Sequence, residues 1–191
     1  METLHIELQK KSKNKFVLSD DYSLVRGLRD LFLLELKHIY WSEKSLLKII
    51  PKILNTITSI EILDVLKNHL EVSKTHVTKI EKVFSLINEK SVPQKCEIMA
   101  GLISDIDRKI NTNRKGILRD ASIISEVLKI ENYEIATYKT LCTFARNLKE
   151  KDSVKILHEI LNQEKEVDEK LFEIMETMMY EFGNTYELEN V

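Results

Sequence analysis

The chain has 191 residues, of which 43% are hydrophobic and 31% charged, and it contains only 4 glycines and 2 prolines. So few turn-forming residues exclude an all-β sandwich or barrel, and the apolar content excludes a disordered chain. Basic and acidic residues nearly balance, 29 against 31, which argues against a protein that binds nucleic acid or an anionic membrane through bulk charge. The composition therefore predicts a single helical domain.

The sequence carries no sign of export or of membrane insertion. Its N-terminal residues lack an apolar stretch of signal-peptide length, and no run of about 18 uncharged apolar residues occurs. The two cysteines are too few for a disulfide framework. We therefore expect a cytoplasmic protein. Residues 1–22 are predicted to form a charged N-terminal arm, 23–182 a helical bundle and 183–191 a polar C-terminal tail.

Apolar residues recur at helical spacing along four long segments. The first runs over about 24–57, where Pro51 is expected to kink the helix. The second covers 60–88, and a shorter amphipathic piece follows at 97–110. The third covers 118–148 and the fourth 153–182, where Gly183 is expected to end the helix. Two short turns and one long link of about 30 residues predict an all-α, ferritin-like four-helix bundle whose crossover carries a short extra helix.

Ionisable residues lie at the centres of all four apolar stripes. An unpaired carboxylate in a bundle core costs several kcal/mol, and no Lys or Arg lies at the same depth on these stripes. Each residue is about 14–19 positions from the turn of its own hairpin, so a rise of about 1.5 Å per residue places all of them near one level. The residues are Glu43, His76, Glu131, Glu134, Glu164 and Asp168.

Carboxylates and imidazole that converge from facing helices are the ligands that a pair of iron or manganese ions requires. The pattern therefore predicts a metal site made by these six residues. The alternative is a purely structural cluster of charges. His69 shares the stripe of His76 but lies two turns earlier, so it is interpreted as a polar core residue. Tyr138 is assigned to packing, with a hydrogen bond to a ligand or a role as a redox partner as the alternatives. Cys142 is interpreted as a small buried hydrophobe.

Two segments carry a family resemblance, Glu-Asn-Tyr-Glu-Ile-Ala-Thr-Tyr at 131–138 and Glu-Lys-Glu-Val-Asp-Glu-Lys-Leu at 164–171. With further matching segments in the same order over about 24–175, the sequence resembles the YciF/YciE-like ferritin-like family of bacterial stress-associated proteins. The resemblance implies a ferritin-like bundle, a di-metal centre and a homodimer. It implies no settled biochemical activity.

The sequence departs from the pattern of that family at three positions. Val72 stands where the family has Glu, Asn132 where it tends to have His, and His38 where it tends to have Asp. The loss of a carboxylate at Val72 leaves three outcomes open, namely two metal ions, one ion or none.

These observations support two main hypotheses of function. The first is a di-iron or di-manganese type carboxylate protein that handles peroxide, oxygen or iron under stress. The second is a non-catalytic stress-associated scaffold with a degenerate metal site that acts through a protein partner. A storage cage is a weaker third possibility. The sequence assigns no catalytic residue, and it does not decide whether the protein is an enzyme.

Overall fold

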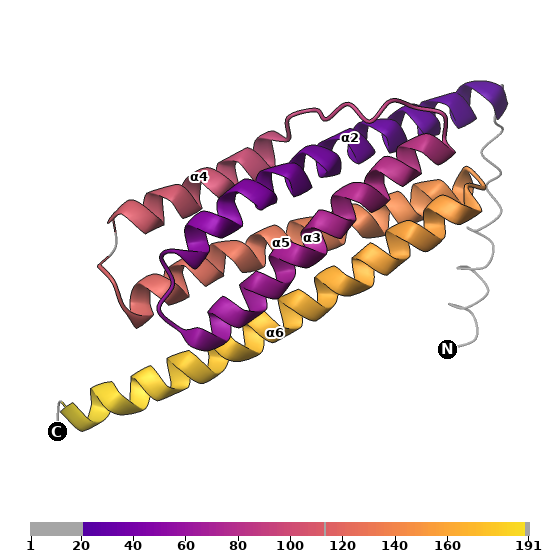
Figure 1. The fold of residues 1–191 in the computed structure, drawn as a ribbon. Coiled ribbons are helices and arrows are strands. Elements are labelled where there is room, and N and C mark those ends of the chain that lie inside the picture. The colour runs from indigo at the N-terminus through magenta and orange to yellow at the C-terminus, as the bar shows by residue number, and fades with distance from the viewer. Residues whose placement is uncertain (1–20, 113, 190–191) are drawn as a thin grey trace, which may run out of the picture.

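The computed structural model describes residues 21–112 and 114–189, and it folds them into helices without a strand in this part of the chain (Figure 1). None of the helices in these residues is long and apolar enough to cross a membrane. The all-α expectation is confirmed. The helices are α2 (Asp21–Leu54), α3 (Ile60–Leu86), α4 (Glu97–Thr112), α5 (Ile117–Asn147) and α6 (Lys151–Glu189).

Four of these helices form a bundle. Helix α2 packs against α3 and α5, and α6 packs against the same two helices, so α2 and α6 lie at opposite corners. In Figure 1, α3 and α5 run in one direction and α2 and α6 in the other, so each helix is antiparallel to both of its neighbours. Helix α4 lies outside this ring, against α5 and α2.

The long crossover explains why α3 and α5 run in the same direction. After α3, residues 87–96 run back along α2, where the Gln94 backbone N–H donates a hydrogen bond to the Lys37 carbonyl at 3.2 Å. Helix α4 then completes the return, so that α5 starts at the end of the bundle where α3 began (Figure 1). A short loop would have made α5 antiparallel to α3. The predicted ferritin-like bundle with one long crossover is confirmed.

Helices α3 and α5 both end in a Schellman motif. Residues Asn88 and Lys149 have positive φ angles of 56° and 64°. The next N–H in each case bonds back to the helix, from Glu89 to the Phe84 carbonyl and from Glu150 to the Ala145 carbonyl, both at 2.9 Å. These bonds satisfy carbonyls that the helix end would otherwise leave without donors. The chain can then turn sharply after each of these helices.

Two predicted helix ends differ from the structure. Helix α6 continues through Gly183 to Glu189, so the predicted end at Gly183 is wrong. A glycine inside a helix costs about 1 kcal/mol relative to alanine, but it ends the helix only if it takes a left-handed conformation, and Gly183 does not. Helix α2 continues through Pro51 and ends at Leu54, before the predicted end near 57. Residues 1–20 of the predicted arm lie outside the described residues.

Candidate metal centre

The polar residues predicted for the core lie between two separate hydrophobic clusters. Along α2, Glu43 separates Ile39 and Tyr40 of one cluster from Leu46 of the other. Along α6, Glu164 in the same way separates Leu161 from Val167. In α3 and α5, the polar residues likewise lie between residues of one cluster and residues of the other. We call this level the acidic layer; its members are all at most 1% exposed and are Glu43, His69, His76, Glu131, Glu134 and Glu164.

One half of the acidic layer is a group of three side chains from α2, α3 and α6. The His76 Nδ1 atom lies 2.8 Å from Glu164 Oε1 and 3.2 Å from Glu43 Oε1. One ligand atom from each of these residues can be chosen so that all three lie within 4.8 Å of one another. A single cation placed among them would therefore meet two carboxylates and one imidazole.

The other half combines α3, α5 and α6. The His69 Nε2 atom lies 3.4 Å from Glu131 Oε1, and His69 Nδ1 lies 4.0 Å from Glu164 Oε2. These three residues also offer ligand atoms within 4.8 Å of one another. Glu164 belongs to both groups, with Oε1 toward His76 and Oε2 toward His69. One carboxylate therefore lies between two adjacent candidate cation positions.

Glu134 and Asp168 belong to neither group of three. Glu134 is fully buried, and within the described residues neither of its carboxylate oxygens has a hydrogen-bond partner. Asp168 is only partly buried, and its Oδ1 accepts a hydrogen bond from Asn132 Nδ2 at 2.8 Å. Glu134 is thus available to an ion in the layer, whereas Asp168 lies at its edge and is engaged by Asn132.

Two tyrosines of α5 border the layer in different ways. The Tyr138 hydroxyl is buried and donates a 2.5 Å hydrogen bond to Glu43 Oε1. The Tyr133 hydroxyl lies 3.0 Å from the Cys96 sulfur, away from the carboxylates. Tyr138 therefore packs in the core and also donates a hydrogen bond to Glu43, a proposed metal ligand. Cys142 is buried in one hydrophobic cluster, as expected.

The two histidines differ in charge. Burial lowers the pKa of His69, which favours a neutral ring near neutral pH. Burial alone would also lower the pKa of His76, but the charge of Glu43 and the hydrogen bond to Glu164 raise it to about 10. His76 is consequently a cation in the metal-free protein and pairs with two of the four carboxylates.

The carboxyl groups also differ in the direction in which their pKa values are shifted. Burial favours the neutral form of Glu164, but the nearby histidines hold the pKa of this carboxyl below its ordinary value. Burial raises the pKa of Glu131 well above the ordinary value, and the charge of Glu164 raises it further. Burial and the charge of Glu43 act alike on Glu134. Without a further cation, burial and the neighbouring carboxylates therefore favour the protonated forms of Glu131 and Glu134.

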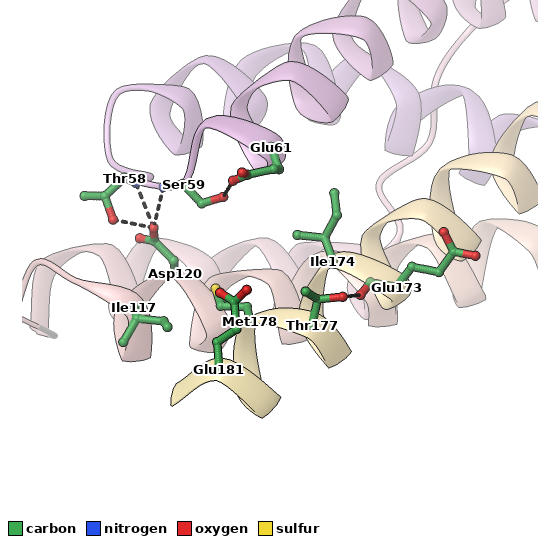
Figure 2. Close-up of a pocket in the computed structure, with 10 residues that line it drawn as sticks. All are labelled: Thr58, Ser59, Glu61, Ile117, Asp120, Glu173, Ile174, Thr177, Met178 and Glu181. Atoms are coloured by element: carbon green, nitrogen blue, oxygen red, sulfur yellow. Dashed lines mark hydrogen bonds between the residues drawn. The ribbon is translucent and has the colours of Figure 1, made fainter. Parts of the chain in front are cut away.

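A surface pocket of about 560 Å³ lies away from the acidic layer, where the α2–α3 turn meets α5 and α6 (Figure 2). At its wall, Asp120 Oδ2 accepts hydrogen bonds from the Thr58 and Ser59 backbone N–H groups, at 2.8 and 2.9 Å. Ile117 and Met178 line it as well. These bonds fasten the turn to α5. No residue of the acidic layer lines this pocket, so the candidate metal centre is a separate, enclosed site.

Comparison with known proteins identifies the family. A family model described as a domain of unknown function, DUF892, matches residues 27–183. The chain belongs to this family. It is 32% identical over 151 residues to Protein YciF of Escherichia coli (strain K12), which covers 78% of the chain and 91% of that protein. The resemblance seen in the sequence is confirmed.

Solved structures agree with this assignment. The crystal structure of the E. coli stress protein YciF matches with a TM-score of 0.77 and 31% identity over 80% of this chain and 97% of that one. YcfI from Rhodopseudomonas palustris matches with a TM-score of 0.74 and 30% identity, over 81% of this chain and 96% of that one. A protein from Xanthomonas campestris pv. campestris shares the fold at 21% identity, with a TM-score of 0.65 over 84% of this chain and 99% of that one.

The structure shows the surroundings of Val72, the position in α3 at which the sequence resemblance leads us to expect Glu. Val72 is only half-buried. The centre of the inward face passes instead through Ser73, which is fully buried and lies between the two histidines. His69 and His76 are the ionisable side chains that α3 contributes to the layer. Here the helix brings two imidazoles, each to one of the two groups.

His69 is the layer residue that the sequence led us to interpret as a polar core residue instead of a metal ligand. Its backbone lies seven residues from that of His76, about 10 Å along the helix axis at about 1.5 Å per residue, which suggested a separate level. The two rings nevertheless approach opposite oxygens of Glu164. The available signal was the spacing itself, because two histidines seven residues apart lie on one face of a helix.

Proposed function

We propose that this protein holds two iron or manganese ions in the acidic layer and handles peroxide, oxygen or iron under stress. The observation that carries the proposal is a set of buried ligand atoms without hydrogen-bond partners among the described residues. It includes both carboxylate oxygens of Glu134, Glu43 Oε2 and His69 Nδ1. Buried polar atoms of this kind are costly unless an ion or another partner satisfies them.

Charge balance supports the number of ions. The layer contains four carboxylates, and with both imidazoles neutral two divalent cations would balance them. Glu164 would contact both ions, since its two oxygens face the two groups of side chains. Oxygen ligands with imidazole suit iron, manganese and zinc, so the donor set fits the proposed ions without selecting one of them.

The residues around the site have definable tasks in this chemistry. Bound iron or manganese would supply electron transfer and Lewis acidity for reaction with an oxidant. Tyr138 holds Glu43 in place through its hydroxyl, which donates to Glu43 Oε1. The two hydrophobic clusters exclude bulk water above and below the layer. The name of the related stress protein YciF supports a role under stress.

Elemental mass spectrometry on protein purified without a His tag tests the proposal. We expect about two iron or manganese ions per chain after anaerobic loading, together with loss of hydrogen peroxide or oxygen-dependent iron oxidation. Glu131→Ala should abolish both the binding of metal and the reaction with the oxidant. The matched control is Glu126→Gln on the same helix, because Glu126 pairs with Lys109 and Lys129 outside the layer. Loaded protein without turnover would leave a binding protein and remove the enzymatic role.

A second candidate is a non-catalytic scaffold that acts through a protein partner. Its specific support is His76, an internal cation that already neutralises part of the layer by pairing with Glu43 and Glu164. The absence of a carboxylate at Val72 points the same way. This candidate predicts a melting temperature that chelation hardly changes, whereas tight metal binding predicts a fall of several degrees.

We further propose that the protein is a homodimer, as its resemblance to the family implies, and that it resides in the cytoplasm, as expected from its sequence. Trp41, which lies beside the inward stripe of α2, is partly exposed and packs against one hydrophobic cluster. Sedimentation equilibrium measures the assembly directly. A dimer supports the proposal and excludes a storage cage, whereas a monomer or a large shell contradicts it.

A further inference from the structure

A row of polar side chains connects His76 with the surface at the seam between α3 and α6. The His76 Nε2 atom lies 3.1 Å from Gln163 Oε1. The same Gln163 oxygen accepts a hydrogen bond from Lys79 Nζ at 3.0 Å. Lys79 also donates to Glu159 Oε1 at 2.7 Å. The row therefore begins in the acidic layer and ends at Glu159, whose side chain is 60% exposed.

Lys79 determines which end of the Gln163 amide faces inward. A lysine ammonium group only donates hydrogen bonds, so the amide atom that it contacts must be the oxygen. Glu159 holds the ammonium group in place from the other side, as an ion pair. If the amide turned over, its NH₂ group would face the ammonium group of Lys79, which is also a donor. The side-chain oxygen of Gln163 is therefore the atom presented to His76.

This oxygen in turn determines where His76 carries its proton. An amide oxygen accepts hydrogen bonds and cannot donate them, so the Nε2 atom of His76 must carry the hydrogen. In the metal-free protein the His76 cation also carries a hydrogen on Nδ1, which faces carboxylate oxygens. When the ring gives up one hydrogen to bind a metal ion, the acceptor at Nε2 keeps the hydrogen there, which leaves Nδ1 as the atom with a free lone pair. Nδ1 is also the atom that lies 2.8 Å from Glu164 Oε1 and 3.2 Å from Glu43 Oε1.

We propose that Lys79 and Gln163 are positioning residues that hold neutral His76 in its Nε2–H form, so that Nδ1 is the atom that binds metal. This inference rests on the proposed metal centre and specifies how one of its ligands is oriented. Metal-binding histidines characteristically donate their second N–H to a fixed acceptor, which sets the ring orientation. Lys79 and Gln163 supply that acceptor from the seam, and neither contacts the proposed ion.

Zinc is a suitable probe because it is diamagnetic and accepts the same ligands. In ¹⁵N-labelled protein loaded with zinc, long-range proton–nitrogen correlation spectra distinguish Nδ1 from Nε2 coordination. We expect Nδ1 coordination of His76 in the wild type. Gln163→Leu and Lys79→Met should give mixed coordination and weaken zinc binding by about 10- to 100-fold. Gln163→Glu retains an acceptor oxygen and should keep Nδ1 coordination. The matched control is Lys82→Met, one turn further along α3 and exposed.

The metal-free protein provides a second readout that does not depend on metal binding. The His76 Nε2 hydrogen should exchange slowly with water in the wild type and in Lys82→Met, and faster in Gln163→Leu and Lys79→Met. Nε2 coordination in the wild type, or exchange and zinc affinity that are unchanged in both variants, overturns the inference. A wild type that binds no metal overturns the proposed function instead, and the exchange rates alone then decide whether Gln163 and Lys79 orient the ring.

Discussion

At the scale of single residues, the acidic layer contains more negative charge than its internal cation can balance. His76 lies between Glu43 and Glu164, both of which are within 3.2 Å of its Nδ1 atom. Glu131 and Glu134 have no such partner, and burial raises the pKa of each well above its ordinary value. In the metal-free protein at neutral pH, folding therefore favours the uptake of protons by these two residues, which lowers the free energy of unfolding as pH rises.

Replacement of Glu134 by glutamine should stabilise the metal-free protein at alkaline pH. The amide has the shape of the protonated acid but no ionisable proton, so folding no longer has to add a proton to a side chain that is ionised in the unfolded chain. We expect a gain of about 1–3 kcal/mol near pH 8 and little change near pH 5, measured by urea unfolding. Glu126→Gln should act in the opposite sense, because Glu126 is paired with Lys109 at 2.5 Å. A Glu134→Gln effect that does not change with pH would refute the assignment.

Tyr138 offers a second test at this scale. Its hydroxyl donates a 2.5 Å hydrogen bond to Glu43 in a fully buried position. Tyr138→Phe removes a donor from a buried carboxylate and should destabilise the protein by about 1–3 kcal/mol in urea unfolding. Tyr133→Phe on the same helix is the control, since that hydroxyl contacts the Cys96 sulfur instead of a carboxylate, and it should cost less. Equal effects of the two changes would contradict a special role for Tyr138.

At the scale of the helices, the sequence predicts segments that have a periodic pattern of apolar residues. It does not predict helix ends that depend on the backbone conformation of one residue. Periodic apolar residues located α3 and α5 to within two residues of their observed ends. Gly183 was misread because glycine permits a left-handed helix end but does not require one. The ends that do use this conformation are at Asn88 and Lys149. A lysine in that position carries no signal in composition or periodicity.

Lys149→Gly should therefore stabilise the protein, although glycine usually weakens helices. Lys149 has a φ of 64°, a conformation that costs an ordinary residue about 1–2 kcal/mol and glycine almost nothing. Thermal unfolding should show a gain of about 1 kcal/mol, reduced in part by the greater freedom of glycine in the unfolded chain. Lys165→Gly, at an exposed position inside α6, should instead lose about 1 kcal/mol. A loss in both variants would show that the Schellman motif after α5 does not form.

At the scale of the whole molecule, the sequence predicted the layer better than its internal arrangement. Similar distances from the two hairpin turns placed Glu43, Glu131 and Glu164 near one level, and the structure has all three buried between the two hydrophobic clusters. Side-chain reach could not be judged in the same way. Asp168 lies at the edge of the acidic layer and accepts a hydrogen bond from Asn132. His69, two helical turns before His76, nevertheless has its ring 4.0 Å from Glu164 Oε2. Helical periodicity fixes the face and depth of a residue, but the contacts depend on how neighbouring helices are rotated about their axes.

The free energy of unfolding of the metal-free bundle should fall as pH rises, whereas metal binding should increase it. Burial raises the pKa of Glu131 and Glu134 above the ordinary value of 4.5, and Glu43 and Glu164 raise that of His76 from 6.5 to about 10. The folded state therefore binds more protons than the unfolded state above these ordinary values, so stability falls as pH rises. His69, whose pKa is lowered, acts in the opposite sense only at pH values near and below 6.5.

The melting temperature of the metal-free protein should accordingly decrease between about pH 7 and 9. Metal binding needs deprotonated carboxylates and neutral imidazoles, so metal affinity should rise over the same range. Manganese at about 100 times its dissociation constant should add about 2.7 kcal/mol to the free energy of unfolding. Because the layer draws on all four bundle helices, that gain should appear as one cooperative shift in calorimetry. A melting temperature that stays constant with pH and with manganese would show that the buried charges are balanced without metal, as the scaffold candidate requires.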